Sequence, residues 1–548
     1  MAHHLERLER DHDFVVLAVV AHQHQDLLAH VASLVRAPGA LARCREAPTW
    51  APSVPPAGAR GKTGAGGLGQ GRQSLTRPHP CTPARPHIAT GRVPAMVPGA
   101  FMTPVDLPPA GPPASGEARP SGASLLDRLL ALPTLSLLDA QGRDTGDVRE
   151  RAARLARALR GAGVSPGGRV GVALPNGPEF VIALVACLEA RATFVPLSLA
   201  LSPEVRDRRL ERIHAAARVD AHGVVRREAP PPEPAVPVPA VILFTSGSEG
   251  DGRPVALPES ALLHVIDTHH PALAYEPGTR VTGYLPWSHA FGFTLELLMG
   301  LLHGARVRSV PPPSFPEVLA SEPPGFLFTV PRMLERLDAA TLRALRGGVV
   351  GGAPVRGALR EHLQGSRLRV GYGQTECAPG ASLGEAGEWN HDDFLGRALG
   401  CELELCPAGD GEHQELRVRG ANLGLGYVEG ARIQPFPLDT GWRATGDLAS
   451  AVDGGFVSEG RRDELFKLDN GRMVNPVPLE LPFDGRILLV GMGRDLIQPL
   501  ARGEVPSGFT LPIPHLPPRL MPESFWSACT TPTGKVSRRR AQRLFEES

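Results

Sequence analysis

The sequence predicts an α/β protein: a large N-terminal domain of layered α/β subdomains, a β-rich subdomain, and a small C-terminal unit. The first observation is that apolar strand-like and helix-like segments alternate between residues 147 and 376. This alternation favours parallel strands in a layered sheet. The second is a change near residue 400 to short strands separated by Gly and Pro turns, which favours an antiparallel or barrel-like subdomain. A further small unit occupies residues 464–548.

The first elements alternate between helix and strand. Residues 147–162 carry apolar side chains at helical spacing, and Gly163 closes the segment. RVGVAL (169–174) predicts a strand, EFVIALVACLEA (179–190) a buried helix, and TFVPLS (193–198) the next strand. Two parallel strands joined by a buried helix are therefore expected here.

Later strands follow a Pro-rich linker at 229–239, which leads into the buried strand beginning at Val241. Further strands are expected within 280–286, 305–312, 325–331, 342–354 and 367–376, and in the β-rich part within 401–407, 414–420 and 454–460.

Composition excludes several classes of protein. The chain has 548 residues, a net charge of +1 and 21% charged residues, so neither a nucleic-acid-binding surface nor an acidic tail is indicated. Seven scattered cysteines without a CxxC pair fit a reducing, cytoplasmic compartment and no structural zinc. The longest apolar stretches fall short of the roughly 20 residues that cross a bilayer, so no membrane span is predicted.

Residues 1–120 differ from the rest. Positions 50–120 are dense in Pro, Gly, Ala, Arg and Ser, a composition that does not bury enough apolar surface to offset chain entropy. We expect a low-complexity, disordered leader, with the true start of the protein near Met96 or Met102.

Lysine is rare in this chain. Of the 58 basic residues, only Lys62, Lys467 and Lys535 are lysine. Lys is a compact point charge and Arg a wide planar fork, so a lysine that persists in this background indicates a site that Arg cannot serve. Lys535 lies on a Gly turn in TPTGK, which makes it the first candidate for chemistry.

A Gly/Ser loop follows the strand that begins at Val241. In VILFTSGSEGDGRPV (241–255), small residues let backbone N–H groups approach a polyphosphate, and hydroxyls add donors. It is not the GxxxxGK[ST] nucleotide loop, because no Lys follows and no helix is clearly launched. The candidate ATP ligands are Thr245, Ser246, Gly247, Ser248 and Gly250.

Two further strings carry candidate ligands. GYGQTE (371–376) offers an aromatic, an amide, a hydroxyl and a carboxylate in consecutive positions, which suits a nucleotide base and a Mg²⁺-bound phosphate. TGDLA (445–449) places Asp447 at an expected strand end, where a carboxylate accepts bonds from two ribose hydroxyls.

Eight strings in this order resemble the adenylate-forming (AMP-binding) superfamily, which includes acyl- and aryl-CoA synthetases, peptide-synthetase adenylation domains and luciferases. The resemblance covers about 145–548 and is closest to carboxylic-acid:CoA ligases. The strings are TSGSEG (245–250), LPWSHAFG (285–292), VGGAP (350–354), GYGQTE (371–376), ELRVRGANLGLGY (415–427), ATGDL (444–448), GRRDELFK (460–467) and TPTGK (531–535).

The resemblance implies a two-step reaction with ATP and Mg²⁺. A carboxylic acid attacks the α-phosphate and expels pyrophosphate, and a thiol of CoA or phosphopantetheine then displaces AMP. It implies that the 245–250 loop holds the β- and γ-phosphates, with Gly373 and Tyr372 beside the nucleotide. Thr375 would bond the α-phosphate and Glu376 would hold the metal.

The remaining implied roles lie further along the chain. Asp447 would bind the ribose hydroxyls, with Arg461 beside it. The large domain, 121–462, would end at a hinge, Asp463. A small mobile α+β domain, 463–548, would rotate about this hinge and deliver Lys535 between the substrate carboxylate and the α-phosphate. For Lys467 the resemblance alone indicates a role.

The expected acid pocket has no carboxylate. Amino-acid adenylation domains typically carry an Asp for the substrate ammonium, whereas the matching stretch 284–293 (YLPWSHAFGF) has none. A buried, unpaired ammonium is costly, so a substrate without an α-amino group is expected. His289 lies at the pocket mouth or is a packing histidine. The expected walls are Trp287, Ala290, Phe291, Gly351, Gly352, Ala378 and Pro379.

The phosphate loop departs from the family pattern. Glu249 stands where Thr is common, Asp251 follows, and Arg253 replaces the usual Lys. Segments 201–240 and 464–534 are also shorter than the corresponding segments typical of this superfamily. Three functions are consistent with these observations: an acid:CoA ligase, an enzyme that loads a separate acyl carrier protein, and a nucleotide-binding relative without ligase activity.

Overall fold

The structure is a computed structural model. It describes residues 123–132, 137–138, 148–245, 251–321, 325–409, 411–469, 472–483, 485–491, 496–530 and 536–547. The expected leader (1–120) lies wholly before the first of these ranges, so that expectation stays a prediction.

Within these ranges, the first sheet has eight strands. Across the sheet these are β18 (Arg432–Pro435), β17 (Gly426–Glu429), β7 (Pro254–Leu257), β6 (Val241–Phe244), β3 (Thr193–Pro196), β2 (Arg169–Val172), β4 (Ala217–Asp220) and β5 (Gly223–Arg226). The central strands β4, β2, β3 and β6 are parallel, and the outer strands pair antiparallel. The parallel centre confirms the α/β prediction.

The second sheet has twelve strands among the described residues. In order these are β1 (Leu137–Leu138), β9 (Arg306–Ser309), β8 (Arg280–Gly283), β10 (Phe326–Thr329), β11 (Gly347–Gly351), β12 (Leu368–Tyr372), β13 (Ser382–Leu383), β14 (Phe394–Ala398), β20 (Gly455–Arg461), β19 (Arg443–Val452), β16 (Gln414–Arg419) and β15 (Glu402–Pro407). The strands from β1 to β12 are parallel, and all later pairs are antiparallel. The expected change near residue 400 is therefore present, but β13 and β14 join the later strands to the parallel sheet.

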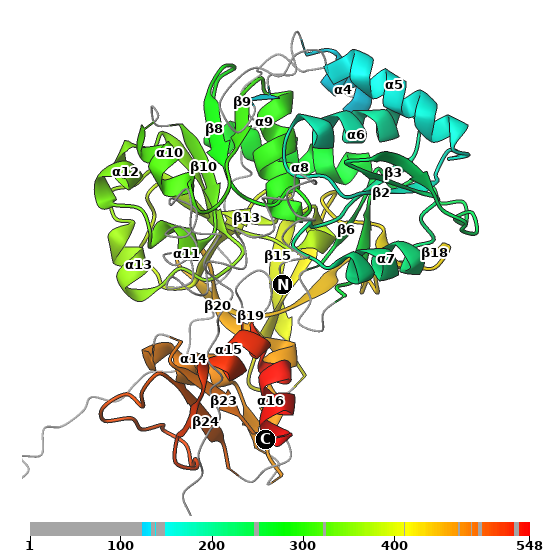
Figure 1. Ribbon diagram of the computed structural model, residues 1–548. Helices are drawn as coiled ribbons and strands as arrows, with labels where there is room; N and C mark the ends of the chain where they lie inside the picture. Colours follow the sequence, from blue (N-terminus) through cyan, green and yellow to red (C-terminus); the bar gives the residue numbers. More distant parts are fainter. Residues whose placement is uncertain are drawn as a thin grey trace, which may run out of the picture. The chain divides into compact units, whose positions relative to one another are not determined.

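Helices cover these sheets. They are α4 (Leu125–Leu130), α5 (Val148–Gly161), α6 (Pro178–Glu189), α7 (Pro203–Arg212), α8 (Glu259–Leu273), the π-helix η3 (Gly292–Leu298), α9 (Met299–Leu302), α10 (Phe315–Ser321), α11 (Pro331–Leu334), α12 (Ala339–Ala344) and α13 (Gly357–His362). Helix α6 buries every residue from Phe180 to Cys187 and lies between α5 and the strands β2 and β3 (Figure 1). The largest apolar core runs from Leu125 to Phe436 and includes side chains of both large sheets.

The C-terminal elements have their own sheets and cores. They are η5 (Arg462–Glu464), β21 (Phe466–Lys467), β22 (Met473–Val474), α14 (Pro476–Glu480), η6 (Leu481–Phe483), β23 (Ile487–Val490), β24 (Gln498–Arg502), β25 (Arg519–Met521), α15 (Glu523–Cys529) and α16 (Arg538–Glu546). Two clusters of buried apolar side chains, one around Trp526 and one around Leu489, belong to this segment alone. A domain boundary at 462/463 and rotation about it stay predictions.

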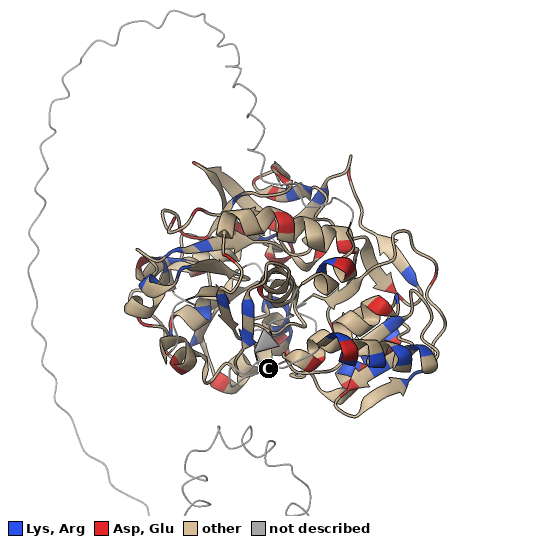
Figure 2. Cartoon of the chain, turned by 90° about the horizontal axis from the view of Figure 1, so that it is seen from above, with Lys and Arg blue, Asp and Glu red and all other residues tan. Residues whose placement is uncertain are grey.

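Charged residues are mixed in sign over the described chain. In the view of Figure 2, Lys and Arg segments are interspersed with Asp and Glu segments, in keeping with the net charge of +1. No helix in the described ranges combines the length and apolar character needed to cross a bilayer.

A buried arginine fixes the hairpin β17–β18. Arg169 is 2% exposed and donates to the carbonyl oxygens of Ile213 (2.6 Å) and Ala431 (2.9 Å) and to that of Gly430. Buried carbonyl groups need such donors, and a planar guanidinium reaches several at once. The side chain thereby joins β2 to the turn of a hairpin that reaches the candidate site.

Replacing this arginine is expected to destabilise the fold. Arg169→Met leaves the three carbonyl oxygens without their donor, and we expect the free energy of unfolding to fall by about 2–4 kcal/mol. Urea unfolding measures this change. The exposed Arg226, on strand β5 of the same sheet, gives the control Arg226→Met, and equal stability of the two variants would contradict the argument.

Candidate active site

The predicted phosphate loop connects two antiparallel strands. At its ends, Thr245 N donates to the carbonyl oxygen of Arg253 (2.9 Å), and Arg253 N donates to Thr245 Oγ1 (2.9 Å). The chain therefore returns as strand β7 rather than launching a helix, as the sequence indicated. Residues 246–250 lie outside the described ranges, so the predicted ligands Ser246, Gly247, Ser248 and Gly250 stay predictions.

The GYGQTE string leaves the parallel sheet at the end of β12. Gly373 follows Tyr372, and a Cβ at Gly373 would lie 1.3 Å from the carbonyl oxygen of Pro379. Only glycine is compatible with this approach. The chain then forms the short 3₁₀ helix η4 (Thr375–Cys377), which carries the predicted residues Thr375 and Glu376.

Asp447 is the centre of a cluster of donors. Its Oδ2 accepts bonds from the Tyr372 hydroxyl (2.6 Å) and from Gln374 Nε2 (2.5 Å), and its Oδ1 accepts from Arg461 Nη1 (2.8 Å). The structure thus brings three residues with predicted roles, Tyr372, Asp447 and Arg461, together. Asp447 lies inside β19 rather than at a strand end as predicted, because the strand continues to Val452 through an irregular register after Leu448.

Glu376 is buried beside a cation. Its Oε1 accepts from the Tyr427 hydroxyl (2.7 Å) and lies 3.2 Å from Arg443 Nη2; the side chains of Arg443 and Glu376 are 8% and 12% exposed. Arg443 Nη1 also donates to Gln374 Oε1 (2.9 Å). Gln374 therefore links the two carboxylates, donating to Asp447 and accepting from the arginine beside Glu376.

Burial and charge both act on the ionisable groups of this cluster. Burial raises the pKa of Tyr372 well above its usual value, and the Asp447 carboxylate raises it further. Burial lowers the pKa of Arg443, but the Glu376 carboxylate and the Tyr427 hydroxyl outweigh it and leave this pKa above its usual range. Both tyrosine hydroxyls therefore remain protonated donors at neutral pH, and Arg443 remains a cation.

Tyr427 connects this cluster to the hairpin of strands β6 and β7, which flank the predicted phosphate loop and are called the phosphate hairpin below. Strand β17 pairs with β7, with Tyr427 opposite Val255. The guanidinium of Arg253 lies 3.3 Å from the centroid of the Tyr427 ring, a cation–π contact. The return strand of the predicted phosphate loop and the carboxylate of Glu376 thus meet on one tyrosine side chain.

The donor set of Glu376 fits a Mg²⁺ ion that is held mainly by a nucleotide. Among the described residues, no group of three or more His, Cys, Asp and Glu side chains has a metal-binding arrangement. Mg²⁺ commonly binds through one or two carboxylates, waters and substrate phosphates. The single carboxylate of Glu376 fits this mode, with Arg443 as a competing cation.

The expected acid-pocket residues divide into two groups. Phe291 is half-buried, and its ring lies 3.5 Å from the Cβ position of Gly351, so these two predicted wall residues are neighbours. His289 is half-buried, and burial followed by the charge of Arg209 lowers its pKa. In contrast, Trp287 is 1% exposed and Ala378 is fully buried, so both lie behind the surface of any pocket.

The other predicted wall residues differ in exposure in the same way. Ala290 is 6% exposed and Pro379 is buried, whereas Gly352 is exposed. Pocket-lining roles for all of these residues stay predictions.

A buried acid, Glu296, was not identified from the sequence. It lies in the π-helix η3, is fully buried, and its Oε1 accepts from Trp287 Nε1 (2.9 Å). Burial raises the pKa of Glu296 to about 8, partly offset by the bonds from Trp287 and the Leu285 backbone. The protonated acid therefore holds the Trp287 side chain of the LPWSH segment through this hydrogen bond. Its sequence signal is a charged residue within an apolar run.

The structure describes the predicted hinge residue and one of the two candidate lysines. Asp463 Oδ1 accepts from Arg461 Nε (2.9 Å), so one arginine bridges Asp447 and the predicted hinge residue. Lys467 is exposed on β21. Lys535 lies outside the described ranges, and its role stays a prediction.

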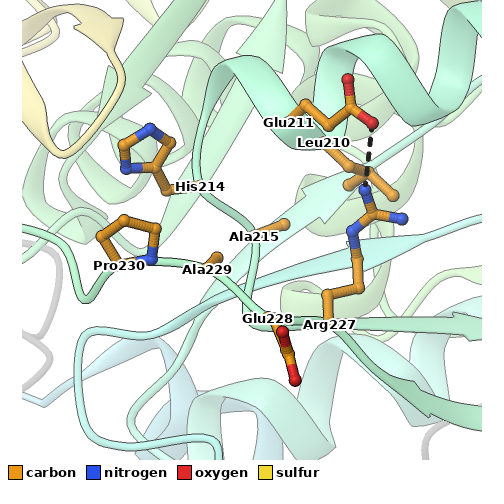
Figure 3. Close-up of a pocket in the computed structure, with 8 residues that line it drawn as sticks. All are labelled: Leu210, Glu211, His214, Ala215, Arg227, Glu228, Ala229 and Pro230. Carbon is orange, nitrogen blue, oxygen red and sulfur yellow. Dashed lines mark ion pairs between the residues drawn. The ribbon is translucent and has the colours of Figure 1, made fainter.

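A small cavity lies away from this cluster. Figure 3 shows a cavity of about 130 Å³ bounded by the end of α7 and the segment after β5, with Glu211 and Arg227 facing each other at 4.0 Å. None of the predicted site residues lines it.

Tyr427 and Arg443 join the site although the sequence analysis gave them no roles, and Gln374, the amide of the GYGQTE string, joins it by linking the two carboxylates. Gln374 and Tyr427 lie within the GYGQTE and ELRVRGANLGLGY strings, and Arg443 directly precedes ATGDL. Their positions inside or beside the recognised strings were the available signal. Their hydrogen-bond partners lie 51 to 73 residues away along the chain, and this separation left no local signal in the sequence.

Two sequence comparisons identify similar proteins. The model of the family described as "AMP-binding enzyme" matches residues 144–227 and 215–428. The feruloyl-CoA synthase of Amycolatopsis sp is 29% identical over 382 residues, covering 61% of this chain and 76% of that protein.

Solved structures have the same fold. ATP-bound MatB from Rhodopseudomonas palustris matches with a TM-score of 0.63 and 18% identity, over 77% of this chain and 99% of MatB. The O-succinylbenzoate coenzyme A synthetase (MenE) of Bacillus subtilis, in complex with ATP and magnesium ion, matches with a TM-score of 0.63 and 19% identity, over 76% and 98% of the two chains.

The buried acid predicts a pH dependence of stability. Folded Glu296 keeps its proton up to about pH 8, whereas the unfolded chain releases it near the ordinary value of 4.5. Between these values the folded state binds more protons, so rising pH favours unfolding. We expect the wild type to lose about 1.4 kcal/mol per pH unit relative to Glu296→Gln over this window.

Urea unfolding at about pH 5, 6 and 7.5 measures this difference. Glu317→Gln, at an exposed glutamate, is the matched control and is expected to track the wild type. A Glu296→Gln variant whose stability runs parallel to that of the wild type at all three pH values would contradict a buried, protonated acid.

Proposed function

Because the chain belongs to the AMP-binding enzyme family, we propose that it activates a carboxylic acid with ATP and transfers the acyl group to the thiol of CoA. Adenylation of the acyl-CoA ligase type is the chemistry of this family match and of the feruloyl-CoA synthase relative. The identity of the acid and the choice of CoA as acceptor belong to the proposal.

One observation carries the proposal: Asp447 and Glu376 are held in a single hydrogen-bonded cluster beside the return strand of the phosphate hairpin. A nucleotide needs a carboxylate for its ribose hydroxyls, a metal ligand near its phosphates and a loop for its outer phosphates. In this proposal, Asp447 takes the first of these tasks and Glu376 the second, and their place in one cluster supports it.

In the first step, a carboxylate oxygen of the substrate attacks the α-phosphorus of ATP. The bond from this phosphorus to the bridging oxygen breaks, and pyrophosphate leaves with the electron pair. The protein must orient the two reactants and stabilise the charge that develops on the phosphoryl oxygens. In this proposal, the Thr375 hydroxyl donates to the α-phosphate, and Lys535 places its ammonium between the two reacting anions.

Mg²⁺ held by Glu376 and the phosphates would neutralise part of the triphosphate charge. Residues of the chain bind and orient the rest of the nucleotide. Asp447 accepts from the ribose hydroxyls while Gln374 and Arg461 hold its carboxylate in place. Tyr372 lies beside the base.

In the second step, the thiol sulfur attacks the carbonyl carbon of the acyl-adenylate. AMP leaves, and the thiol proton passes to solvent. Lys535 is then no longer needed at the α-phosphate. In this proposal, the small C-terminal part rotates about Asp463 between the two steps. The rotation removes Lys535 from the α-phosphate and brings up another face of this part, which forms the tunnel for the thiol.

The proposed substrate is a carboxylic acid without an α-amino group. The stretch 284–293 contains no carboxylate, and the nearby Glu296 is fully buried with its Oε1 bound to Trp287. An ammonium in this pocket would thus lack a partner. Aliphatic and aromatic acids both meet this requirement, and the feruloyl-CoA synthase relative favours an aromatic acid.

A second candidate function follows from the Arg443–Glu376 pair. A buried guanidinium 3.2 Å from the proposed metal ligand already neutralises its charge. This favours a relative that binds nucleotide but turns over slowly or not at all. An enzyme that loads a separate acyl carrier protein remains the alternative for the thiol acceptor.

An acid panel separates these functions. Purified protein is incubated with ATP, Mg²⁺ and one acid at a time, and pyrophosphate and AMP release are measured with and without CoA. A CoA ligase releases pyrophosphate with one class of acid and releases AMP at a high rate only when CoA is added. AMP release with a phosphopantetheinylated carrier but not with CoA would support the alternative, and no pyrophosphate with any acid would support the non-ligase relative.

Loss of the candidate lysine is expected to slow adenylation. Lys535→Ala removes one charge contact to the transition state and should reduce acid-dependent pyrophosphate release by about a hundredfold (~3 kcal/mol), with the Kd for ATP unchanged. Stopped assays of pyrophosphate release and calorimetric titration of ATP measure the two quantities. Arg540→Ala, at an exposed arginine of α16, serves as the control for loss of a nearby cation. Near-normal release by Lys535→Ala would contradict the assignment.

A further inference from the structure

Arg209 is a buried arginine beside the phosphate hairpin, and the sequence analysis gave it no role. It lies on α7, is 8% exposed, and its guanidinium is 4.5 Å from the centroid of the Phe244 ring. Phe244 is the last residue of β6, directly before Thr245. In the described part of the chain, the buried Nε of Arg209 has no hydrogen-bond partner.

The same guanidinium lies against the returning end of the hairpin. Arg209 Nη2 is 3.2 Å from the position that a Cβ on Gly252 would occupy, and Gly252 has a positive φ of +65°. A side chain at this glycine would also lie 2.3 Å from the carbonyl oxygen of Thr245. Arg209 therefore lies beside Phe244, which precedes the loop, and beside Gly252, which follows it.

Neighbouring arginines of α7 satisfy the local acceptors and leave Arg209 without one. Asp251 pairs with the exposed Arg208 (3.2 Å), and the Gly252 carbonyl accepts from the exposed Arg212 (2.9 Å). Arg209 has no ion pair within 4.0 Å among the described residues. Its pKa is lowered to about 10 by burial, against the raising effect of Asp251, so it is still a cation at neutral pH.

An unpaired buried cation is costly to keep. Burying a charge without hydrogen bonds or a counter-ion destabilises a fold, and native structures rarely retain such a group without a reason. A cation–π contact offsets only part of this cost. A bound anion would supply the counter-charge and the hydrogen-bond acceptors that the described residues do not give to Arg209.

We propose that Arg209 is a binding residue for the outer phosphates of ATP and for the departing pyrophosphate. The proposal rests on the proposed function, because that function places a polyphosphate at the 245–250 loop. The planar guanidinium donates to two phosphate oxygens at once, which suits a site where negative charge accumulates as pyrophosphate leaves.

The unusual loop sequence gives a reason for an additional cation here. Glu249 and Asp251 place two carboxylates in a loop whose ligand is itself an anion. Asp251 is paired by Arg208, and the buried Arg209 adds a positive charge that no described carboxylate pairs. The arginine-rich sequence of α7 (PEVRDRRLER) thereby offsets the acidic character of the loop.

The experiment compares binding of three probes to Arg209→Met and to the wild type. The probes are MgATP, magnesium pyrophosphate and AMP, titrated by calorimetry in the absence of acid and CoA. We expect Arg209→Met to bind MgATP and pyrophosphate about tenfold more weakly or worse and AMP equally well. We also expect the ligand-free variant to unfold at the same or a higher temperature, because a buried unpaired charge has been removed.

The matched control is Arg206→Met. Arg206 is half-buried on the same helix, and its side chain makes no hydrogen bond or ion pair within the described ranges. It should leave the affinities for all three probes unchanged. If Arg209→Met does not fold, Arg209→Lys keeps the charge but loses the fork, and it should weaken pyrophosphate binding while sparing AMP.

The outcomes separate this proposal from the proposed function. Wild-type protein that binds neither AMP nor ATP would overturn both. Wild-type protein that binds both, together with an Arg209→Met variant whose ATP-to-AMP affinity ratio is unchanged, would overturn the role of Arg209 alone. A raised KM for the acid with unchanged pyrophosphate affinity would place Arg209 in the acid pocket beside His289 and would equally overturn it.

Discussion

The pairing of two carboxylates, Asp447 and Glu376, is the constraint on which the candidate site depends. Both are largely buried, and a buried charge must be paired or hydrogen-bonded if the fold is to tolerate it. Arg461 pairs with the first and Arg443 with the second, and Gln374 connects the two pairs. These bonds hold the end of β12, the strand β19 and the hairpin β17–β18 in one arrangement. The proposed nucleotide site therefore depends on electrostatic pairing between segments that are distant in sequence.

The fold positions this cluster through a few local requirements. Gly373 lets the chain pass the Pro379 carbonyl between Tyr372, which bonds to Asp447, and Glu376, which bonds to Tyr427. Arg169 fixes the hairpin that presents Tyr427. The antiparallel return of the phosphate hairpin then brings Arg253 over the Tyr427 ring. Each requirement is met by one residue, which contacts either a backbone carbonyl group or the ring of Tyr427. Together these contacts position the segments that carry the two carboxylates and their partners.

The sequence predicted the parallel sheet because its strands and helices alternate as local apolar runs. Segments such as 179–190 and 193–198 match α6 and β3 closely, since burial on all sides leaves an uninterrupted apolar string. The motif residues Tyr372 and Asp447 were also identified, and the structure joins them at 2.6 Å. Their identification relied on ordered strings, which carry information about chemistry but not about distance.

Other parts of the site depend on pairings that no local pattern reports. Arg443 and Arg209 look like ordinary basic residues in an arginine-rich chain, and only burial and partners distinguish them. Glu296 was not identified from the sequence, and the structure places it fully buried in the π-helix η3, where it accepts a bond from Trp287 Nε1. Asp447 was expected at a strand end, yet β19 continues to Val452.

The most direct measurement of the central claim compares AMP with 2′,3′-dideoxy-AMP. If Asp447 binds the ribose hydroxyls, the wild type binds AMP more tightly by about tenfold or more, as expected for hydrogen bonds to a charged group. In Asp447→Asn this preference should largely disappear, while both ligands still bind. Equal affinity of the wild type for the two ligands, or an unchanged preference in Asp447→Asn, would contradict the account.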